Sequence, residues 1–388
     1  MISKNMLTYI KSSLAIKKYP TADRNAHIFR IMAQGIPYYM SRAGYSFPPL
    51  SIFIHLNTNC NLKCSFCDAG QDDPESMFYK NLKGGSNVNM PLESFKSIID
   101  KVKFFKPFVG IPATEPSLYP DIIEAIQYIT DNDLRCSIAT NGTLLEGLAE
   151  DLIDANITKL IISLDGPERI HDKIRGVPGT FDKVVKGIKK IDEIKKRTGR
   201  ETPYIYLNYV IAEDNYETLV EMVDTVPLDL IQQVDFRVMF FCTEDVAKMH
   251  NKSFGQMYDA TSACLSGGID LKNVDTRKLY GQIKELDRKY GAKCKFFFNH
   301  GEEGLRIYYH EPEKFLDETK CMFPWYTLQI ATDGTVIPPQ RCYANDFGNI
   351  IEQEFSEIWN GKKMRQFRKD LKKYGRFPAC TRCEGVNY

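Results

Sequence analysis

Short apolar runs alternate with amphipathic segments over residues 51–240 of the chain. The runs are rich in β-branched and aromatic residues, which favours strands, whereas the longer segments carry apolar residues at helical spacing. We predict strands at 51–56, 108–111, 134–139, 159–164, 204–211 and 234–240. We predict helices at 90–105, 121–131, 144–155, from Thr180 onward, and at 216–223. Strands that alternate with helices predict an α/β fold with a parallel sheet and right-handed crossovers.

The two ends of the chain differ from this central region. Residues 1–50 predict two amphipathic helices with a break near Pro20, which we interpret as a helical cap. Residues 241–320 predict one helix, at 275–292, and their aromatic residues fit either a core or the wall of a substrate site. We therefore divide the chain into an N-terminal cap 1–50, a sheet region 51–240, a connecting region 241–320 and a C-terminal domain 321–388.

Composition narrows the class of protein without naming a function. The chain has 43% hydrophobic and 26% charged residues and a net charge of +1, which is typical of a globular protein and gives no sign of nucleic acid binding. It has no apolar run near 18 residues and no apolar leader after its first residues, so we expect a cytoplasmic protein. Its eleven cysteines are then expected to be thiols or metal ligands rather than disulfides.

Basic residues gather in two segments of the chain. Residues 1–50 hold seven Lys and Arg against one acid, and residues 362–376 hold eight against Asp370. One interpretation is that these charges only solvate packed helices. The other is that they form a surface for an anionic membrane or substrate, giving a peripheral membrane contact.

Three cysteines lie within eight residues, as Cys60, Cys64 and Cys67. A loop this short can give one sulfur to each of three irons of a cubane cluster and leave the fourth iron open. Zinc would need a fourth ligand nearby, and no further cysteine or histidine follows until Cys136. The spacing Cys-x3-Cys-x2-Cys, with Phe66 before the third cysteine, resembles the radical S-adenosylmethionine (SAM) superfamily. This resemblance implies a (β/α)6 partial TIM barrel, a [4Fe–4S] cluster on these cysteines, and S-adenosyl-L-methionine on the open iron.

Polar groups follow the later predicted strands, where active sites of parallel sheets form. The segment with Glu115 and Pro116 resembles the family's Gly-Gly-Glu-Pro segment, although Ala113 and Thr114 replace both glycines. The resemblance implies that Glu115 contacts the SAM amino group.

Three later segments resemble the family in the same way. Asn141, in a Thr-Asn-Gly turn, is expected beside the cofactor. Ser163 and Asp165 supply a hydroxyl and a carboxylate for the ribose or the methionyl ammonium. Arg175 is expected to bind the SAM carboxylate, and the alternative for it is a charge on a helix surface.

The last part of the chain carries a second set of cysteines, Cys321, Cys342, Cys380 and Cys383. An Asp-Gly pair between the apolar runs 327–331 and 335–337 predicts a β-hairpin among them. One helix is predicted to contain Ile358, Trp359 and Phe367. Zinc would fit four thiolates on ligand count alone. The arrangement resembles the SPASM/twitch extension of radical SAM enzymes, which implies a second, auxiliary [4Fe–4S] cluster with all four irons ligated.

These features lead to one expected function and two alternatives. We expect an enzyme, an oxidoreductase, that cleaves SAM reductively to a 5′-deoxyadenosyl radical and takes hydrogen from an unactivated C–H bond, with the auxiliary cluster accepting an electron. The first alternative is a redox-neutral epimerisation or C–C bond formation on a peptide or lipid. The second is a non-catalytic iron–sulfur or zinc protein. The expected partners are a reductant such as flavodoxin or ferredoxin and an unknown small-molecule, peptide or lipid substrate.

Overall fold

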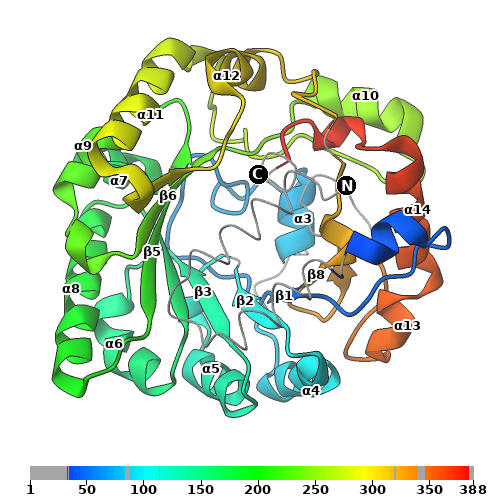
Figure 1. Ribbon diagram of the computed structural model, residues 1–388, viewed down its shortest axis with the longest axis horizontal. Helices are drawn as coiled ribbons and strands as arrows, with labels where there is room; N and C mark the ends of the chain where they lie inside the picture. Colours follow the sequence, from blue (N-terminus) through cyan, green and yellow to red (C-terminus); the bar gives the residue numbers. More distant parts are fainter. Residues whose placement is uncertain are drawn as a thin grey trace.

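The computed structural model describes residues 33, 35–83, 88–112, 114–318, 320–338 and 346–383. The predicted N-terminal helices lie mostly outside these residues, as does Cys342. The described chain builds one nine-stranded sheet in the order β7-β6-β5-β4-β3-β2-β1-β8-β9. The sheet curves around the centre of the molecule and helices surround it, as in a partial barrel (Figure 1).

All six predicted strands are present and parallel, with small differences at their ends. They are β1 (Ser51–Ile54), β2 (Phe108–Ile111), β3 (Cys136–Thr140), β4 (Lys159–Ser163), β5 (Tyr204–Ile211) and β6 (Gln233–Val238). Along β5 every second residue is buried, and the buried members Ile205, Leu207, Tyr209 and Ile211 belong to the hydrophobic core. The residues between them are half-buried and lie on the opposite face of the strand.

The sheet continues beyond the six predicted strands on both sides. On one side β7 (Cys294–Phe296) adds in parallel to β6, and the sequence pattern did not predict this short strand. On the other side β8 (Thr327–Ile330) pairs in parallel with β1, and β9 (Val336–Ile337) pairs antiparallel with β8. The predicted hairpin is therefore confirmed, and it belongs to the same sheet as the barrel strands. The boundaries that we drew between the four regions stay predictions.

The five predicted central helices are present with small differences at their ends, but two helices of the central region, at 77–83 and 168–175, were not predicted. Between the strands lie α4 (Leu92–Val102), α5 (Ile122–Asp131), α6 (Leu145–Asp154), α7 (Glu168–Arg175), α8 (Thr180–Thr198) and α9 (Leu219–Thr225). Further helices are α3 (Met77–Lys83), α10 (Glu244–Phe254), α11 (Thr276–Tyr290), α12 (Gly301–His310), α13 (Phe355–Trp359) and α14 (Lys362–Tyr374), and residues 35–40 are helical as well. The prediction of one helix through Trp359 and Phe367 was wrong, because Asn360 and Gly361 separate α13 from α14.

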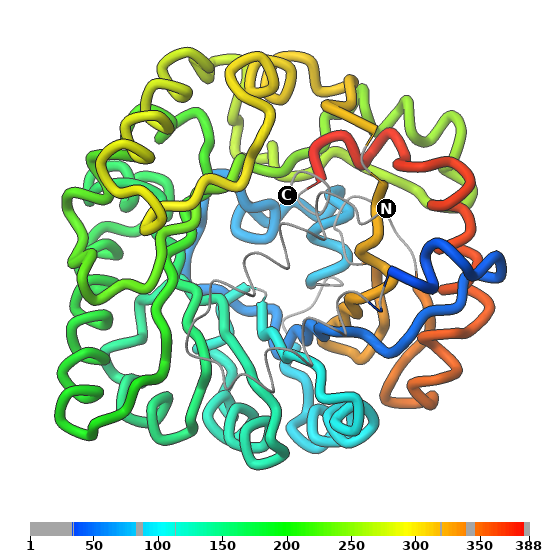
Figure 2. Tube along the Cα trace, viewed as in Figure 1, coloured from blue at the N-terminus to red at the C-terminus, as the bar shows by residue number. Residues whose placement is uncertain are grey.

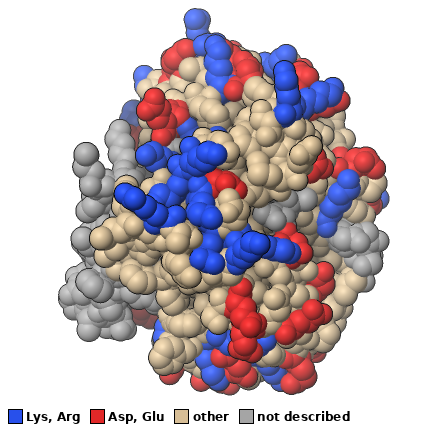
Figure 3. All heavy atoms as spheres, turned by 90° about the vertical axis from the view of Figure 1, so that its right-hand side faces the viewer, with Lys and Arg blue, Asp and Glu red and all other residues tan. Residues whose placement is uncertain are grey.

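The N-terminal segment 35–50 lies beside α14 at the other end of the chain (Figure 2). Arg368 of α14 donates from Nη1 to the carbonyl of Gly44 at 3.1 Å, and Trp359 Nε1 donates to the carbonyl of Phe47 at 2.8 Å. Lys and Arg side chains gather on the face of the molecule that carries α14 (Figure 3). Within the described ranges, no helix is both long and apolar enough to cross a membrane.

Candidate active site

The loop with Cys60, Cys64 and Cys67 follows β1 and is held by backbone hydrogen bonds to α7. The Lys63 N–H donates to the Arg175 carbonyl at 3.2 Å, and the Ser65 N–H donates to the Ile174 carbonyl at 2.9 Å. These carbonyls lie at the C-terminal end of α7, where a helix leaves its last carbonyls without intrahelical partners. The loop therefore takes its position from the helix that also carries Arg175.

A second anchor of this loop is Asp68, which directly follows the third cysteine and is fully buried. Its carboxylate accepts hydrogen bonds from Ser76 Oγ at 2.5 Å, from the Cys264 N–H at 2.7 Å and from Ser266 Oγ at 2.7 Å. The connecting region thus packs directly on the cysteine loop. Sequence reasoning missed Asp68, and its only signal was an acid placed next to the motif.

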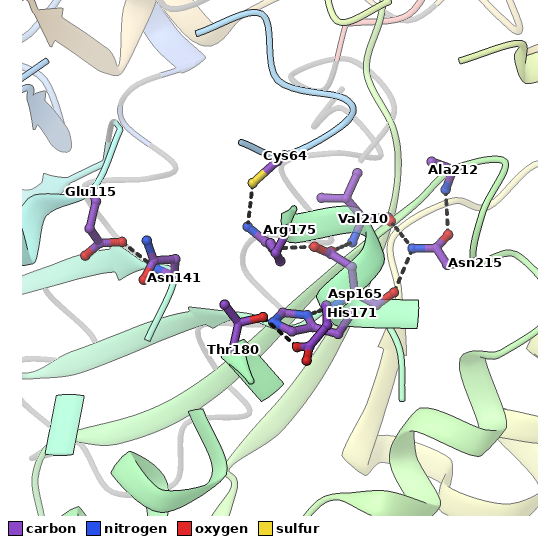
Figure 4. A network of polar contacts seen from close by, with 11 residues as sticks. Cys64, Glu115, Asn141, Asp165, His171, Arg175, Thr180, Val210, Ala212 and Asn215 are labelled. Atoms are coloured by element: carbon purple, nitrogen blue, oxygen red, sulfur yellow. Dashed lines mark hydrogen bonds and ion pairs between the residues drawn. The ribbon is translucent and has the colours of Figure 1, made fainter. Parts of the chain in front are cut away.

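The three cysteines differ in exposure and in charge environment. Cys60 is exposed, Cys64 is buried and Cys67 is half-buried. Burial raises the pKa of the Cys64 thiol to about 12, and the Arg175 charge opposes this rise. Arg175 Nη1 donates to Cys64 Sγ at 3.5 Å (Figure 4). The guanidinium is therefore placed to stabilise negative charge on this sulfur.

Arg175 also pairs with the carboxylate of Asp165, and both side chains are buried (Figure 4). The other carboxylate oxygen, Oδ1, accepts from the Val210 N–H of β5 at 2.9 Å. Asn215 Nδ2 donates to the carbonyls of Asp165 and Val210 at 2.9 and 2.8 Å. The network joins the cysteine loop to β5, so the alternative of a surface charge at Arg175 was wrong. Asn215 was not predicted, because an amide after a strand carries no distinct pattern.

Glu115 connects the ends of β2 and β3 with the cysteine loop. Its carboxylate accepts from the Asn141 N–H at 2.6 Å, from Thr140 Oγ1 at 2.6 Å and from the N–H and hydroxyl of Ser117 at 3.0 and 2.6 Å. Its own N–H donates to the Asn59 carbonyl at 2.9 Å. Burial raises the pKa of the Glu115 carboxyl, and the bonds to its oxygens oppose the rise.

The remaining predicted SAM contacts lie around the same strand ends. Asn141 Nδ2 donates to Asn61 Oδ1 of the cysteine loop at 2.8 Å. Ser163 is half-buried at the end of β4, and Phe66 packs partly buried against the core. The carboxylates of Glu115 and Asp165 already have protein partners. Direct contact with SAM would therefore replace some of these hydrogen bonds with bonds to SAM. The SAM contacts stay predictions.

The donor set of the cysteine loop fits an iron–sulfur cluster, although its side chains are spaced more widely than metal ligands. Among the residues that the structure describes, no three His, Cys, Asp or Glu side chains are grouped closely enough to hold a metal ion. One short loop nevertheless supplies three sulfurs, and one of them already accepts from a guanidinium. Arg175 Nε is buried without a hydrogen-bond partner, so the site still has a donor to offer to a bound group.

The second set of cysteines lies near the end of the chain. Cys321 is half-buried and Cys380 and Cys383 are buried. Burial raises the pKa of Cys380 to about 12, the Cys321 charge raises it further, and the Arg376 charge lowers it. Cys321 and Cys380 are therefore electrostatic neighbours. Arg376 also lowers the pKa of Cys321, against the dominant effect of burial.

Arg382, between Cys380 and Cys383, fixes this segment to α12. It is 1% exposed, and its five N–H groups donate to five backbone carbonyls. The acceptors are Ile307, Tyr308, Glu311, Lys314 and Thr381. Two of these carbonyls belong to the last turn of α12, so the arginine serves as its C-terminal cap.

Two family models match the chain. Residues 54–226 match the Radical SAM superfamily, and residues 321–384 match an iron–sulfur cluster-binding domain, SPASM. The chain is 34% identical to an AdoMet-dependent heme synthase of Methanosarcina barkeri over 350 residues, which covers 86% of this chain and 88% of the relative. It is 25% identical to an Fe-coproporphyrin III synthase of the same organism over 318 residues, 79% of this chain and 72% of the relative.

Among solved structures, SuiB of Streptococcus suis bound to S-adenosylmethionine has a TM-score of 0.58 at 19% sequence identity. The similarity covers 98% of this chain and 82% of SuiB, and at this identity it supports the fold alone. The expected fold class and cofactors are confirmed. The chain belongs to the radical SAM superfamily, and it is an enzyme that uses S-adenosylmethionine, a [4Fe–4S] cluster and a SPASM-type auxiliary iron–sulfur site.

Proposed function

We propose that this protein is an oxidative radical SAM enzyme that removes two electrons from an unactivated C–H position of its substrate. One observation carries the proposal: both cysteine sets lie on segments joined to paired strands of one sheet. β1 leads into the loop with Cys60, and β8, which pairs in parallel with β1, follows shortly after Cys321. A second redox centre in the same fold would be able to accept the substrate's second electron.

Cys60, Cys64 and Cys67 would hold the catalytic cluster. SAM bound to that cluster supplies a 5′-deoxyadenosyl radical that takes hydrogen from the substrate. Arg175 holds the sulfur of Cys64 in place and balances its charge. Glu115 fixes the Asn141 backbone beside the loop, and so keeps two strand ends in register with the cofactor. We propose that the side chains that contact SAM are Phe66, Glu115, Asn141, Ser163, Asp165 and Arg175.

The other four cysteines would hold the auxiliary cluster, with Cys342 completing the set of Cys321, Cys380 and Cys383. Arg376 contributes positive charge there, because its guanidinium lowers the pKa of Cys321 and Cys380. Positive charge beside a cluster favours its reduced state, and this suits an electron acceptor. An external reductant such as flavodoxin or ferredoxin would supply the electron that starts each SAM cleavage.

The test separates the two cysteine sets under anaerobic conditions. Wild-type protein should hold about eight irons, from two four-iron clusters. Replacing Cys60, Cys64 and Cys67 together by Ala should remove half the iron and all SAM cleavage. Replacing Cys380 and Cys383 by Ala should remove the other half and leave SAM cleavage without oxidised product. Product formation by the second variant would instead favour the redox-neutral alternative.

A tetrapyrrole is the first substrate that we would test. The reason is the 34% identity with an AdoMet-dependent heme synthase over most of both chains. We infer that an iron porphyrin binds on the inner face of the barrel and is oxidised there. Anaerobic incubation with iron coproporphyrin III, SAM and dithionite should consume SAM and yield a porphyrin of altered mass. SAM cleavage without any change in the porphyrin would exclude this substrate.

A further inference from the structure

Charged side chains lie on the inner face of strands β4 to β7, and the site described above does not use them. The strand register brings Ser163, Asn208, Asp235 and Lys295 into one row across four neighbouring strands. Residues in one row of a parallel sheet point to the same face. The row begins at Ser163, which we propose as a SAM contact, so it leads from the cofactor across the inner face.

The next row brings a cation still closer to the cysteine network. Arg237 of β6 is the strand partner of Val210 on β5, and the Val210 N–H is the group that donates to Asp165 Oδ1 at 2.9 Å. Neighbouring strands lie about 4.8 Å apart. Arg237 is therefore one strand away from the network of Asp165, Arg175 and Cys64.

Three cations and one carboxylate share this part of the face. Arg237 lies 3.7 Å from Asp235, and the Asp235 side chain is 9% exposed. Lys159 lies in the electrostatic field of Asp235, Arg237 and Lys295 together. Cations outnumber carboxylates by three to one within this group of four side chains. Such a group attracts an anion, and the attraction is strongest where water is partly excluded.

Aromatic rings give the same area flat apolar surfaces. The Lys159 ammonium lies over the Tyr206 ring at 3.4 Å from its centre. Arg237 and Lys295 both lie over the Phe297 ring, at 4.3 and 4.2 Å. Attraction to the face of a ring helps to hold a cation in position. The arrangement therefore offers positive charge beside apolar walls.

We propose that Lys159, Arg237 and Lys295 form a subsite that binds carboxylate groups of the substrate and positions its C–H bond next to the SAM site. This inference rests on the proposed function and narrows its substrate to an organic acid with an apolar body. Arg237 suits a carboxylate because a guanidinium can bind both of its oxygens. Asp235 then acts as an internal competitor that keeps the cations in place when no substrate is bound.

The probes for the experiment are iron coproporphyrin III and its methyl ester, which lacks free carboxylates. Both are titrated by absorbance into the reconstituted, SAM-bound enzyme. Wild type should bind the acid much more tightly than the ester. Arg237→Gln and Lys295→Gln should each weaken binding of the acid by about tenfold or more, because a hydrogen bond to a charged group is lost. Neither variant should change binding of the ester.

Two further variants separate substrate binding from a structural role. Asp235→Asn should tighten binding of the acid, since it removes the competing charge, and a purely structural network does not predict this sign. Arg288→Gln is the matched control, because Arg288 is an exposed surface cation whose side chain is 72% exposed. Equal binding of acid and ester by wild type, or binding of neither, would overturn the subsite. SAM cleavage without substrate, measured in the same samples, tests the proposed function separately.

Discussion

Arg382 offers a direct test of how the C-terminal cysteine segment is held. It is buried between Cys380 and Cys383, and each of its five N–H groups donates to a backbone carbonyl. We consider the change Arg382→Lys, which keeps the positive charge. A lysine ammonium has three N–H donors, so at least two of the five hydrogen bonds are lost.

The expected loss of stability follows from those lost hydrogen bonds. A hydrogen bond to a charged group contributes about 1.5–3 kcal/mol, so the loss of two lowers the free energy of unfolding by about 3–6 kcal/mol. The unfolding entropy is about 2.1 cal/mol/K per residue, or about 0.8 kcal/mol/K for a chain of this length. The melting temperature should therefore fall by roughly 4–7 °C. The segment with Cys380 and Cys383 should lose its position first, because the arginine joins it to α12.

Thermal unfolding followed by circular dichroism, together with iron content, measures both effects. Arg382→Lys should melt earlier and lose iron from the auxiliary site while SAM cleavage continues. Arg288→Lys is the control, since Arg288 forms an exposed ion pair with Glu285 at 2.7 Å, and such pairs contribute about 1 kcal/mol or less. Identical melting and iron content in the two variants would refute the reasoning.

Three other predictions concern the cofactor, the substrate and the surface. SAM binding should weaken by about tenfold at unchanged iron content in each of Glu115→Gln, Asp165→Asn and Arg175→Lys, because each change alters a charged hydrogen bond. Calorimetric titration measures the affinity for SAM, and an affinity equal to that of the parent in all three variants would contradict our assignment. Iron coproporphyrin III should bind less tightly as pH rises through about 8, because burial lowers the Lys159 pKa to about 8 and only the protonated lysine attracts a carboxylate. The affinity of Lys159→Met should not change with pH in this range, and a change that persists in that variant would belong to another group. If the basic face binds membranes, binding to phosphatidylserine vesicles should fall steeply with salt. Changing the exposed Lys362, Lys369 and Lys373 of α14 to Glu should also reduce this binding. Absence of vesicle binding at low salt would mean that these charges only solvate the surface.

The central sheet could be predicted because its pattern is local. Each apolar run, such as 204–211, indicates its own strand, and the alternation with helices indicates the topology. The cysteine loop is recognisable for the same reason, since its three cysteines lie within eight residues and their spacing resembles that of a known family. Features that are formed within one short segment can therefore be predicted from the sequence.

Features that depend on distant segments were missed. The sequence of α7 is highly polar and gives no sign that Arg175 is buried, because its partners Cys64 and Asp165 lie outside the helix. The pairing of β8 with β1 was also missed, because the local sequence of a strand does not indicate which other strand it pairs with. Asp68 was not singled out in the sequence, because two of the groups that donate to its carboxylate lie almost 200 residues later in the chain. Buried polar contacts of this kind require the fold before they can be seen.

The pairing of β1 with β8 also determines when the sheet around the cysteine loop can be completed during protein synthesis. His55, just after β1, meets Gln329 of β8, which lies 274 residues later. At about 5–20 residues per second, a ribosome needs roughly 14–55 s to make the intervening chain. Throughout that time β1 has no β8 beside it and is the open edge of an unfinished sheet. The loop with Cys60 directly follows this open strand. Iron is therefore expected to enter only after translation has delivered β8, the strand that covers this edge.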